Sequence, residues 1–175
     1  MLQRRQALLR VLTVSWGATP CTLWAQPPPP SEQCAGPPPP LGSRIELPEL
    51  LLLDGSRFST ADAIGQVVVL YWWASWCPFC ALQTPMMEKL WLAHRARCLR
   101  LVGLSIDKKP EDATEHRTRR RYSFPSAWVA PAIARALPEP KGLPITVVIG
   151  RDGRVVMSEA GQLFAEDIEG IARFL

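Results

Sequence analysis

Apolar and polar residues along the chain follow two different periods, and the changes between them mark the expected elements. Long runs of apolar, β-branched and aromatic residues are typical of strands that are covered on both faces. Such runs lie at 67–73, "VVVLYWW", and at 99–107, "LRLVGLSID". We therefore predict a buried strand at each of these places.

The segment after the first run changes to a helical period. Apolar residues that recur three and four positions apart share one face of a helix. Between residue 78 and about residue 95, the positions with this spacing are Leu82, Met86, Leu90 and Ala93. The pattern predicts a helix over 78–95 with these side chains on its buried face.

Shorter patterns and turn residues place the other elements. Asp152-Gly153 separates two β-prone runs, which is typical of a hairpin turn. The further predicted elements are a strand at 50–53, hairpin strands at 145–149 and 154–157, and helices at 59–65, 110–122, 132–137 and 165–175. The charges of "HRTRRR", 116–121, are expected on a solvated helix face rather than against a partner. Strands and helices in this order predict an α/β fold with helices around a small mixed sheet.

The N-terminal part of the chain has a different composition. Residues 1–25 combine a basic start, "MLQRRQALLR", with a short apolar stretch, which is typical of an export signal. Its two adjacent arginines leave the Sec and the twin-arginine routes open, and a retained N-terminal membrane anchor is the alternative to cleavage. Residues 26–40, "QPPPPSEQCAGPPPP", predict a semi-rigid polyproline tether. The folded domain is therefore expected at 41–175.

Composition narrows the classes of function. The chain has 175 residues, of which 47% are hydrophobic and 21% charged, as is usual for one globular domain. The net charge of +4 is a mild excess and lies partly in the N-terminal segment, so we expect no nucleic-acid partner. Five cysteines are too few for a disulfide-stapled miniprotein.

Two cysteines form a close pair in "WWASWCPFC", 72–80, between the first buried strand and the predicted helix. A structural zinc site needs four ligands, commonly two close pairs, and the sequence has no second Cys-x-x-Cys, so no metal is expected. A purely structural disulfide at this spacing closes almost no loop and constrains the unfolded chain little. A redox-active pair is therefore favoured. Cys34 and Cys98 could pair with each other, but we expect them to be unpaired.

Placement at the start of a helix gives each cysteine of the pair a role. Free N–H groups and the helix dipole stabilise a thiolate on Cys77, and Pro78 suits the first helical position. Cys80, one turn further, is placed to attack a mixed disulfide formed on Cys77. We therefore assign Cys77 as the nucleophile and Cys80 as the resolving thiol. Trp76 and Phe79, beside the pair, are candidate substrate contacts.

In these features the chain resembles the thioredoxin superfamily, and within it the TlpA/ResA-like periplasmic thiol-disulfide oxidoreductases. The similarity covers 41–175 and is carried by "ELPELLLLDGSRFSTADAIGQVVVLYWWASWCPFC", by Pro85 and by "GLPITVVIGRDGRVV". It implies a thioredoxin-like fold and no cofactor. It also implies that Pro144 is a cis-proline facing the cysteines, and that the backbone of Leu143 pairs with the substrate chain.

The resemblance further implies function and partners. It points to a monomeric periplasmic enzyme that reduces protein disulfides and receives electrons from a membrane thiol donor. The alternatives are an enzyme that introduces or isomerises disulfides, and a non-catalytic copper or haem-ligand chaperone. Copper-delivering relatives use a longer cysteine spacing and a distant histidine, neither of which is present here.

Two positions depart from the family pattern. Tyr71 stands where thioredoxins place a buried aspartate, and Gln83 stands where many TlpA-like proteins place a glutamate. The proton acceptor for Cys80 is therefore not identified by the resemblance. The Pro-Phe dipeptide between the cysteines also differs from that of reducing members, and it could make the pair more oxidising.

Overall fold

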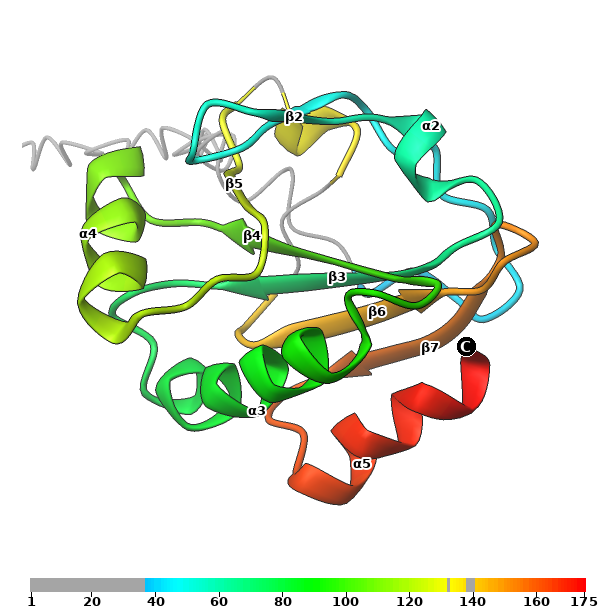
Figure 1. The fold of residues 1–175 in the computed structure, drawn as a ribbon. Helices are drawn as coiled ribbons and strands as arrows, with labels where there is room; N and C mark the ends of the chain where they lie inside the picture. Colours follow the sequence, from blue (N-terminus) through cyan, green and yellow to red (C-terminus); the bar gives the residue numbers. More distant parts are fainter. Residues whose placement is uncertain (1–36, 132, 138–140) are drawn as a thin grey trace, which may run out of the picture.

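A five-stranded mixed sheet forms the centre of the molecule (Figure 1). The computed structural model describes residues 37–131, 133–137 and 141–175, so the predicted signal at 1–25 and most of the predicted tether at 26–40 lie outside the described residues. The strand order is β5-β4-β3-β6-β7. The bounds are β3 Val67–Trp73, β4 Leu99–Ser105, β5 Ser126–Trp128, β6 Ile145–Ile149 and β7 Val155–Ala160.

The central strand β3 has a parallel neighbour on one side and an antiparallel neighbour on the other. It pairs parallel with β4 and antiparallel with β6, and β5 and β7 extend the sheet outward. All seven residues of β3 are buried, which confirms the prediction of a strand covered on both faces. Its alternate residues enter two separate clusters, with Trp73 in one and Trp72 in the other.

Helices cover one face of the sheet. The helix α3, Pro78–His94, and the short helix α5, Ala165–Glu169, lie side by side there, and α4, Pro110–Arg120, stands beside the C-terminal ends of β3 and β4 (Figure 1). The two-stranded sheet of β1, Leu50–Leu51, and β2, Arg57–Phe58, packs with the other cluster, and α2, Thr60–Ala63, follows it. Within the described ranges, no helix is both long and apolar enough to cross a membrane.

The N-terminal stretch 42–53 bonds to both edges of the central sheet. At one edge, the amide of Gly42 donates to the carbonyl of Val155, and the amide of Val155 donates to the carbonyl of Ser43. At the other edge, the amide of Leu53 donates to the carbonyl of Ser126. Between these points, Leu47, Leu50 and Leu52 are buried in the cluster on that face of the sheet. One continuous stretch therefore covers part of β7 and part of β5.

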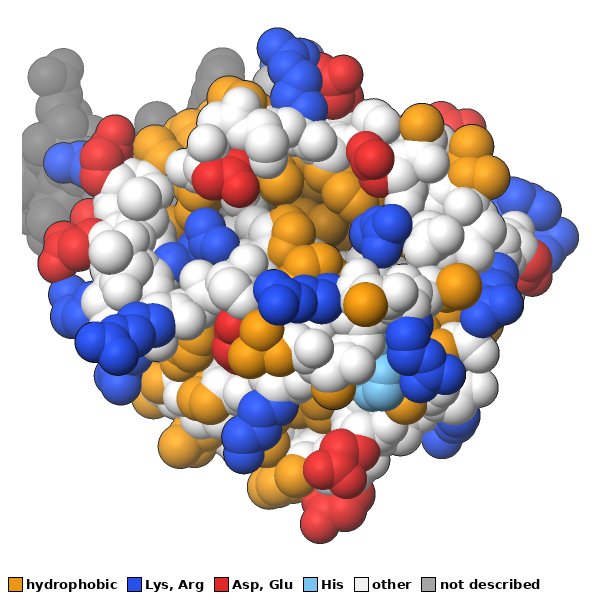
Figure 2. Space-filling model, viewed as in Figure 1, with side chains coloured by type: hydrophobic (Ala, Val, Ile, Leu, Met, Phe, Trp, Pro, Cys, Tyr) orange, Lys and Arg blue, Asp and Glu red, His pale blue; other side chains and the backbone are white. Residues whose placement is uncertain are grey.

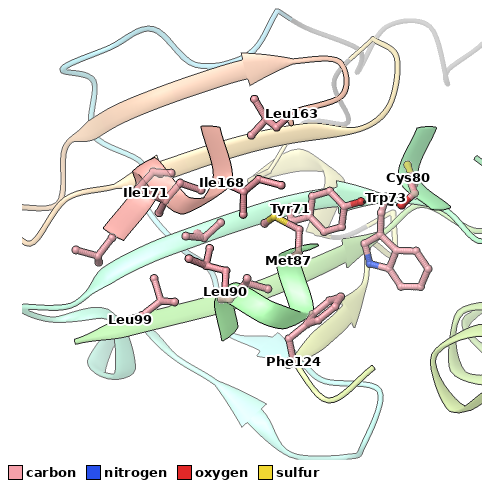
Figure 3. Packing of buried hydrophobic residues seen from close by; sticks show 14 of the residues in the cluster. Tyr71, Trp73, Cys80, Met87, Leu90, Leu99, Phe124, Leu163, Ile168 and Ile171 are labelled. Carbon is pink, nitrogen blue, oxygen red and sulfur yellow. Dashed lines mark hydrogen bonds between the residues drawn. The ribbon is translucent and has the colours of Figure 1, made fainter. Parts of the chain in front are cut away.

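The buried face of α3 differs from the prediction. Leu82 is exposed and so is Ala93, whereas the buried positions are Cys80, Gln83, Thr84, Met87 and Leu90. In Figure 3, Met87 and Leu90 point from α3 toward the sheet, and Tyr71 lies beside Met87. The buried face therefore lies at a different angle around the helix from the predicted one. The prediction counted only apolar residues, whereas two residues of the buried face, Gln83 and Thr84, are polar and hydrogen-bonded.

Other boundaries also differ from the prediction. The strand predicted at 50–53 is only the two residues of β1. The helix predicted at 132–137 is a 3₁₀ turn at Ile133–Arg135. The helix predicted at 165–175 divides into α5 and a 3₁₀ segment at Gly170–Phe174. The short strand β5 was not predicted, because three residues are too few for a period. The hairpin of β6 and β7 is confirmed.

The basic end of α4 is only partly solvated, contrary to the expectation for 116–121. His116 is buried between the rings of Trp73 and Tyr122, and burial lowers the pKa of its imidazole, with a further contribution from nearby arginines. Arg117 is half-buried and donates to the carbonyl oxygen of Phe124 at 2.6 Å. These residues attach α4 to the aromatic core, and the arginines that follow them are exposed.

Gly103 gives a test of this core. A Cβ at this position would lie 2.7 Å from Phe124 Cε2, 2.8 Å from Ser126 Oγ and 2.9 Å from Trp73 Nε1. Because the first and third of these atoms belong to rigid rings, Gly103→Ala should lower the free energy of unfolding by about 1–3 kcal/mol. Urea denaturation followed by tryptophan fluorescence measures this change.

Gly170→Ala is the matched control. At Gly170 the nearest atom to an added Cβ is the flexible tip of Arg173, at 3.9 Å. The control should change the free energy of unfolding by no more than about 0.5 kcal/mol. Equal effects of the two substitutions would contradict the close packing around Gly103.

Candidate active site

The cysteine pair lies where β3 passes into α3. Cys77 and Cys80 form a disulfide with a Cα–Cα distance of 5.2 Å. Cys77 is the N-cap of α3, and its sulfur accepts the backbone N–H of Cys80 at 3.1 Å. Pro78 occupies the first helical position. The predicted strand–pair–helix arrangement is confirmed, and an N–H donor already points at the sulfur of Cys77.

Exposed hydrophobic side chains surround the pair, although both cysteines are almost fully buried. Trp76 is 65% exposed, Phe79 is 56% exposed and Leu82 is 60% exposed. Figure 2 shows hydrophobic side chains gathered over the N-terminal end of α3, at the lower left. Phe79 and Leu82 are three positions apart and so share one helix face. The disulfide therefore sits in a surface that favours contact with apolar groups.

The loop before β6 lies next to the end of β3. The peptide bond between Leu143 and Pro144 is cis, as the resemblance implied. The register pairs Trp72 with Ile145, so the next position brings Pro144 alongside the last residue of β3. Leu143 packs against the cluster that contains both cysteines. Trp76, Phe79, Leu143 and Pro144 thus belong to two segments that flank the disulfide.

Tyr71 fills one of the two positions where the resemblance implies a carboxylate. Its hydroxyl lies 2.9 Å from Thr84 Oγ1, and Thr84 Oγ1 donates to the carbonyl of Cys80 at 2.6 Å. Figure 3 shows the Tyr71 hydroxyl pointing toward the end of the strand where Trp73 and Cys80 lie. Burial raises the pKa of Tyr71 well above its ordinary value. The side chain is therefore neutral and supports the first turn of α3.

Gln83 fills the other position and is also neutral. Its Nε2 donates to Thr146 Oγ1 at 2.9 Å, and its Oε1 accepts the backbone N–H of Leu163 at 2.7 Å. The side chain is fully buried. It joins α3 to β6 and to the loop before α5. Both polar atoms of the side chain have hydrogen-bond partners. At the position where the resemblance implies a charged glutamate, Gln83 is therefore a neutral residue that connects three elements.

One carboxylate does reach the cysteine loop, and sequence reasoning missed it. Asp107 follows β4, is 3% exposed and accepts hydrogen bonds from the backbone and hydroxyl of Ser75. The signal in the sequence is a single acidic residue directly after a buried apolar run. Within the described residues, no three His, Cys, Asp or Glu side chains converge as metal ligands.

Comparison with known proteins agrees with this geometry. The model of the AhpC/TSA family matches residues 42–158. The chain belongs to the AhpC/TSA family. Among its relatives in this family, a thiol-disulfide oxidoreductase ResA of Bacillus cereus is 25% identical over 118 residues, which are 67% of this chain and 68% of the relative.

Solved structures show the same fold. A thiol:disulfide interchange protein of the thioredoxin family from Chlorobium tepidum TLS superposes with a TM-score of 0.70 at 21% identity, over 77% of this chain and 97% of that one. A putative thiol:disulfide interchange protein DsbE from Chlorobium tepidum is 27% identical, with a TM-score of 0.63, over 77% of this chain and 95% of that one. The AhpC/TSA member described here is thus a TlpA/ResA-like protein of the thioredoxin superfamily and a thiol-disulfide oxidoreductase.

The position of Cys77 leads to a prediction about reactivity. In the reduced protein, the N–H of Cys80 and the N-terminus of α3 should stabilise a thiolate on Cys77, whereas Cys80, buried in the first turn, should stay protonated. Iodoacetamide should therefore modify Cys77 near neutral pH, well below the value of about 8.5 at which a free thiol titrates.

Peptide mass spectrometry of the protein alkylated across a pH series distinguishes the two thiols. Cys98, the free thiol of the described residues, is an internal reference. If Cys77 and Cys80 react equally, and only at about pH 8–9, the assignment of Cys77 as the nucleophile is wrong.

Proposed function

We propose that this oxidoreductase is exported and reduces disulfides of protein substrates, with Cys77 as the attacking thiolate and Cys80 as the resolving thiol. The observation that carries the proposal is the disulfide at the start of α3, in which the sulfur of Cys77 accepts the N–H of Cys80. That donor and the helix dipole favour negative charge on Cys77.

The reaction consists of two thiol–disulfide exchanges. The Cys77 thiolate attacks one sulfur of a substrate disulfide, a mixed disulfide forms, and the other substrate sulfur leaves as a thiolate that takes up a proton. Cys80 then loses its proton and attacks the sulfur of Cys77, which releases the second substrate sulfur. The substrate gains two electrons and two protons, and the enzyme is left with the Cys77–Cys80 disulfide seen here.

The surface around the pair supports a polypeptide substrate. Exposed rings at Trp76 and Phe79 offer apolar contact beside the sulfurs. On the neighbouring loop, the backbone of Leu143 would pair with an extended substrate segment next to Pro144. The substrate class is therefore a polypeptide whose disulfide is flanked by apolar residues and is accessible from one side.

The N-terminal sequence supports the proposed location. A basic and then apolar segment at 1–25 is typical of export, and 26–40 would hold the domain away from a membrane if the segment were retained. Regeneration of the dithiol outside the cytoplasm needs two electrons from an external thiol, for which a membrane dithiol protein is the proposed donor. We propose that the enzyme acts as a monomer.

The direction of electron flow depends on a small energy difference. A tenfold change in the exchange equilibrium corresponds to only about 30 mV for a two-electron couple. The family resemblance favours reduction. Neutral side chains at Tyr71 and Gln83, where that resemblance implies carboxylates, would leave a Cys77 thiolate without repulsion from these positions and so favour oxidation of substrates. We propose reduction as the main activity and disulfide introduction or isomerisation as the second candidate.

The reduction potential tests this choice. Equilibration with glutathione, followed by tryptophan fluorescence or by gel shift of alkylated protein, should give a potential more negative than about −180 mV, the value typical of a disulfide isomerase. A potential near about −120 mV, as in a strong dithiol oxidant, would overturn the reductase proposal and favour the second candidate.

Cysteine variants test the assigned roles. Cys80→Ala should leave Cys77 joined to substrate in stable mixed disulfides, because no thiol remains to resolve them. Non-reducing gels and mass spectrometry of an extract from the periplasm detect such adducts. The matched control, Cys98→Ala in the same background, should give the same adducts. Adducts that vanish with Cys98→Ala but persist with Cys77→Ala would show that the site has been misassigned.

A further inference from the structure

The loop between β3 and α3 is attached to the neighbouring strand by one buried carboxylate. Oδ1 of Asp107 accepts the Ser75 hydroxyl at 2.7 Å and the Ser75 backbone N–H at 3.1 Å. Oδ2 accepts the Ser105 hydroxyl at 2.8 Å and the same N–H at 3.2 Å. Ser75 stands two positions before Cys77, and their Cα atoms are therefore at most about 7.6 Å apart.

Only neutral groups hold this carboxylate. Among the described residues, none of the ion pairs includes Asp107. The indole of Trp128 donates to the backbone carbonyl of Asp107 at 2.7 Å and leaves the carboxylate charge unpaired. The imidazole of His116, which interacts with this charge, has a pKa lowered by burial and is neutral at neutral pH. The carboxylate thus accepts hydrogen bonds from hydroxyl and amide donors in a buried position, where screening by solvent is weak.

We propose that Asp107 is a positioning residue for the redox pair. Its carboxylate holds the cysteine loop against β4, and its negative charge makes the Cys77 thiolate less favourable. The proposal rests on the proposed role of Cys77 as the attacking thiol. Through Ser75 the carboxylate fixes the loop that leads to Cys77 at the start of α3. In that loop the amide of Cys77 donates to the carbonyl of Ala74 at 3.2 Å. A like charge disfavours a thiolate, so the same carboxylate makes the dithiol a stronger reductant.

The two effects of Asp107 predict different outcomes for two variants. Asp107→Asn keeps the size of the side chain and one oxygen acceptor but removes the charge. It should shift the pH profile of Cys77 alkylation about one unit lower and shift the glutathione equilibrium about tenfold toward the reduced enzyme, or about 30 mV. Ser75→Ala removes one O–H donor and keeps the charge. It should slow the reaction of Cys77 without any shift of its profile to lower pH.

A purely structural role would not give this pattern. Loss of a structural contact slows the reaction or lowers stability, but it does not stabilise the thiolate. The matched control is Asp152→Asn, which removes an exposed carboxylate from the β6–β7 turn, at the end of the sheet opposite Trp73. This control should leave the alkylation profile and the glutathione equilibrium unchanged within about twofold.

Each outcome decides the proposal. An Asp107→Asn variant with a wild-type profile and equilibrium overturns the electrostatic role, and so does a Ser75→Ala variant with an equal shift to lower pH. If Asp107→Asn does not fold, as judged by circular dichroism, Ser75→Ala and Ser105→Ala carry the test, and wild-type rates in both overturn the positioning role. These measurements use only iodoacetamide and glutathione. If these variants show no effect but Cys80→Ala still forms mixed disulfides on Cys77, only the role of Asp107 is rejected and the proposed function stands.

Discussion

The burial of β3 on both faces is the constraint on which the site depends. A strand with a parallel neighbour on one side and an antiparallel neighbour on the other brings three chain segments to one end of the sheet. At that end, β3 leads into the cysteine loop, β4 leads to Asp107, and the cis peptide of Pro144 precedes β6. Since none of these segments can shift without breaking the core, the disulfide is held by a rigid support rather than by a mobile loop.

Neutral hydrogen-bonding groups replace charges directly beneath the pair. Tyr71 and Gln83 occupy the positions where the family resemblance implies carboxylates, and each has polar partners on a neighbouring element. A neutral pair of side chains costs less to bury than a carboxylate and changes less with pH. The buried carboxylate that does reach the cysteine loop, Asp107, follows the neighbouring strand β4 and accepts the hydroxyl of Ser75.

Much of this arrangement could be predicted from the sequence where a long pattern was present. The strand at 67–73 follows from a continuous apolar run, and the β6–β7 hairpin follows from two β-prone runs around Asp152-Gly153. The placement of the cysteines at a helix start follows from the helical period after them. The buried face of α3 could not be predicted in this way, because Gln83 and Thr84 are buried through hydrogen bonds rather than through apolar contact. Asp107 was missed for a related reason, since its partner Ser75 is 32 positions away in the sequence.

The stretch 42–53 has a consequence for how the chain reaches its folded state. It is among the first parts of the domain to be synthesised, yet its hydrogen-bond partners at Ser126 and Val155 come much later. Until those residues have been synthesised, the backbone groups of 42–53 that pair with them have no partners, and a growing chain would present these unpaired groups to its neighbours. Closure of the two sheet edges is therefore a late event that requires nearly the whole domain, and a truncated chain would be prone to intermolecular strand pairing.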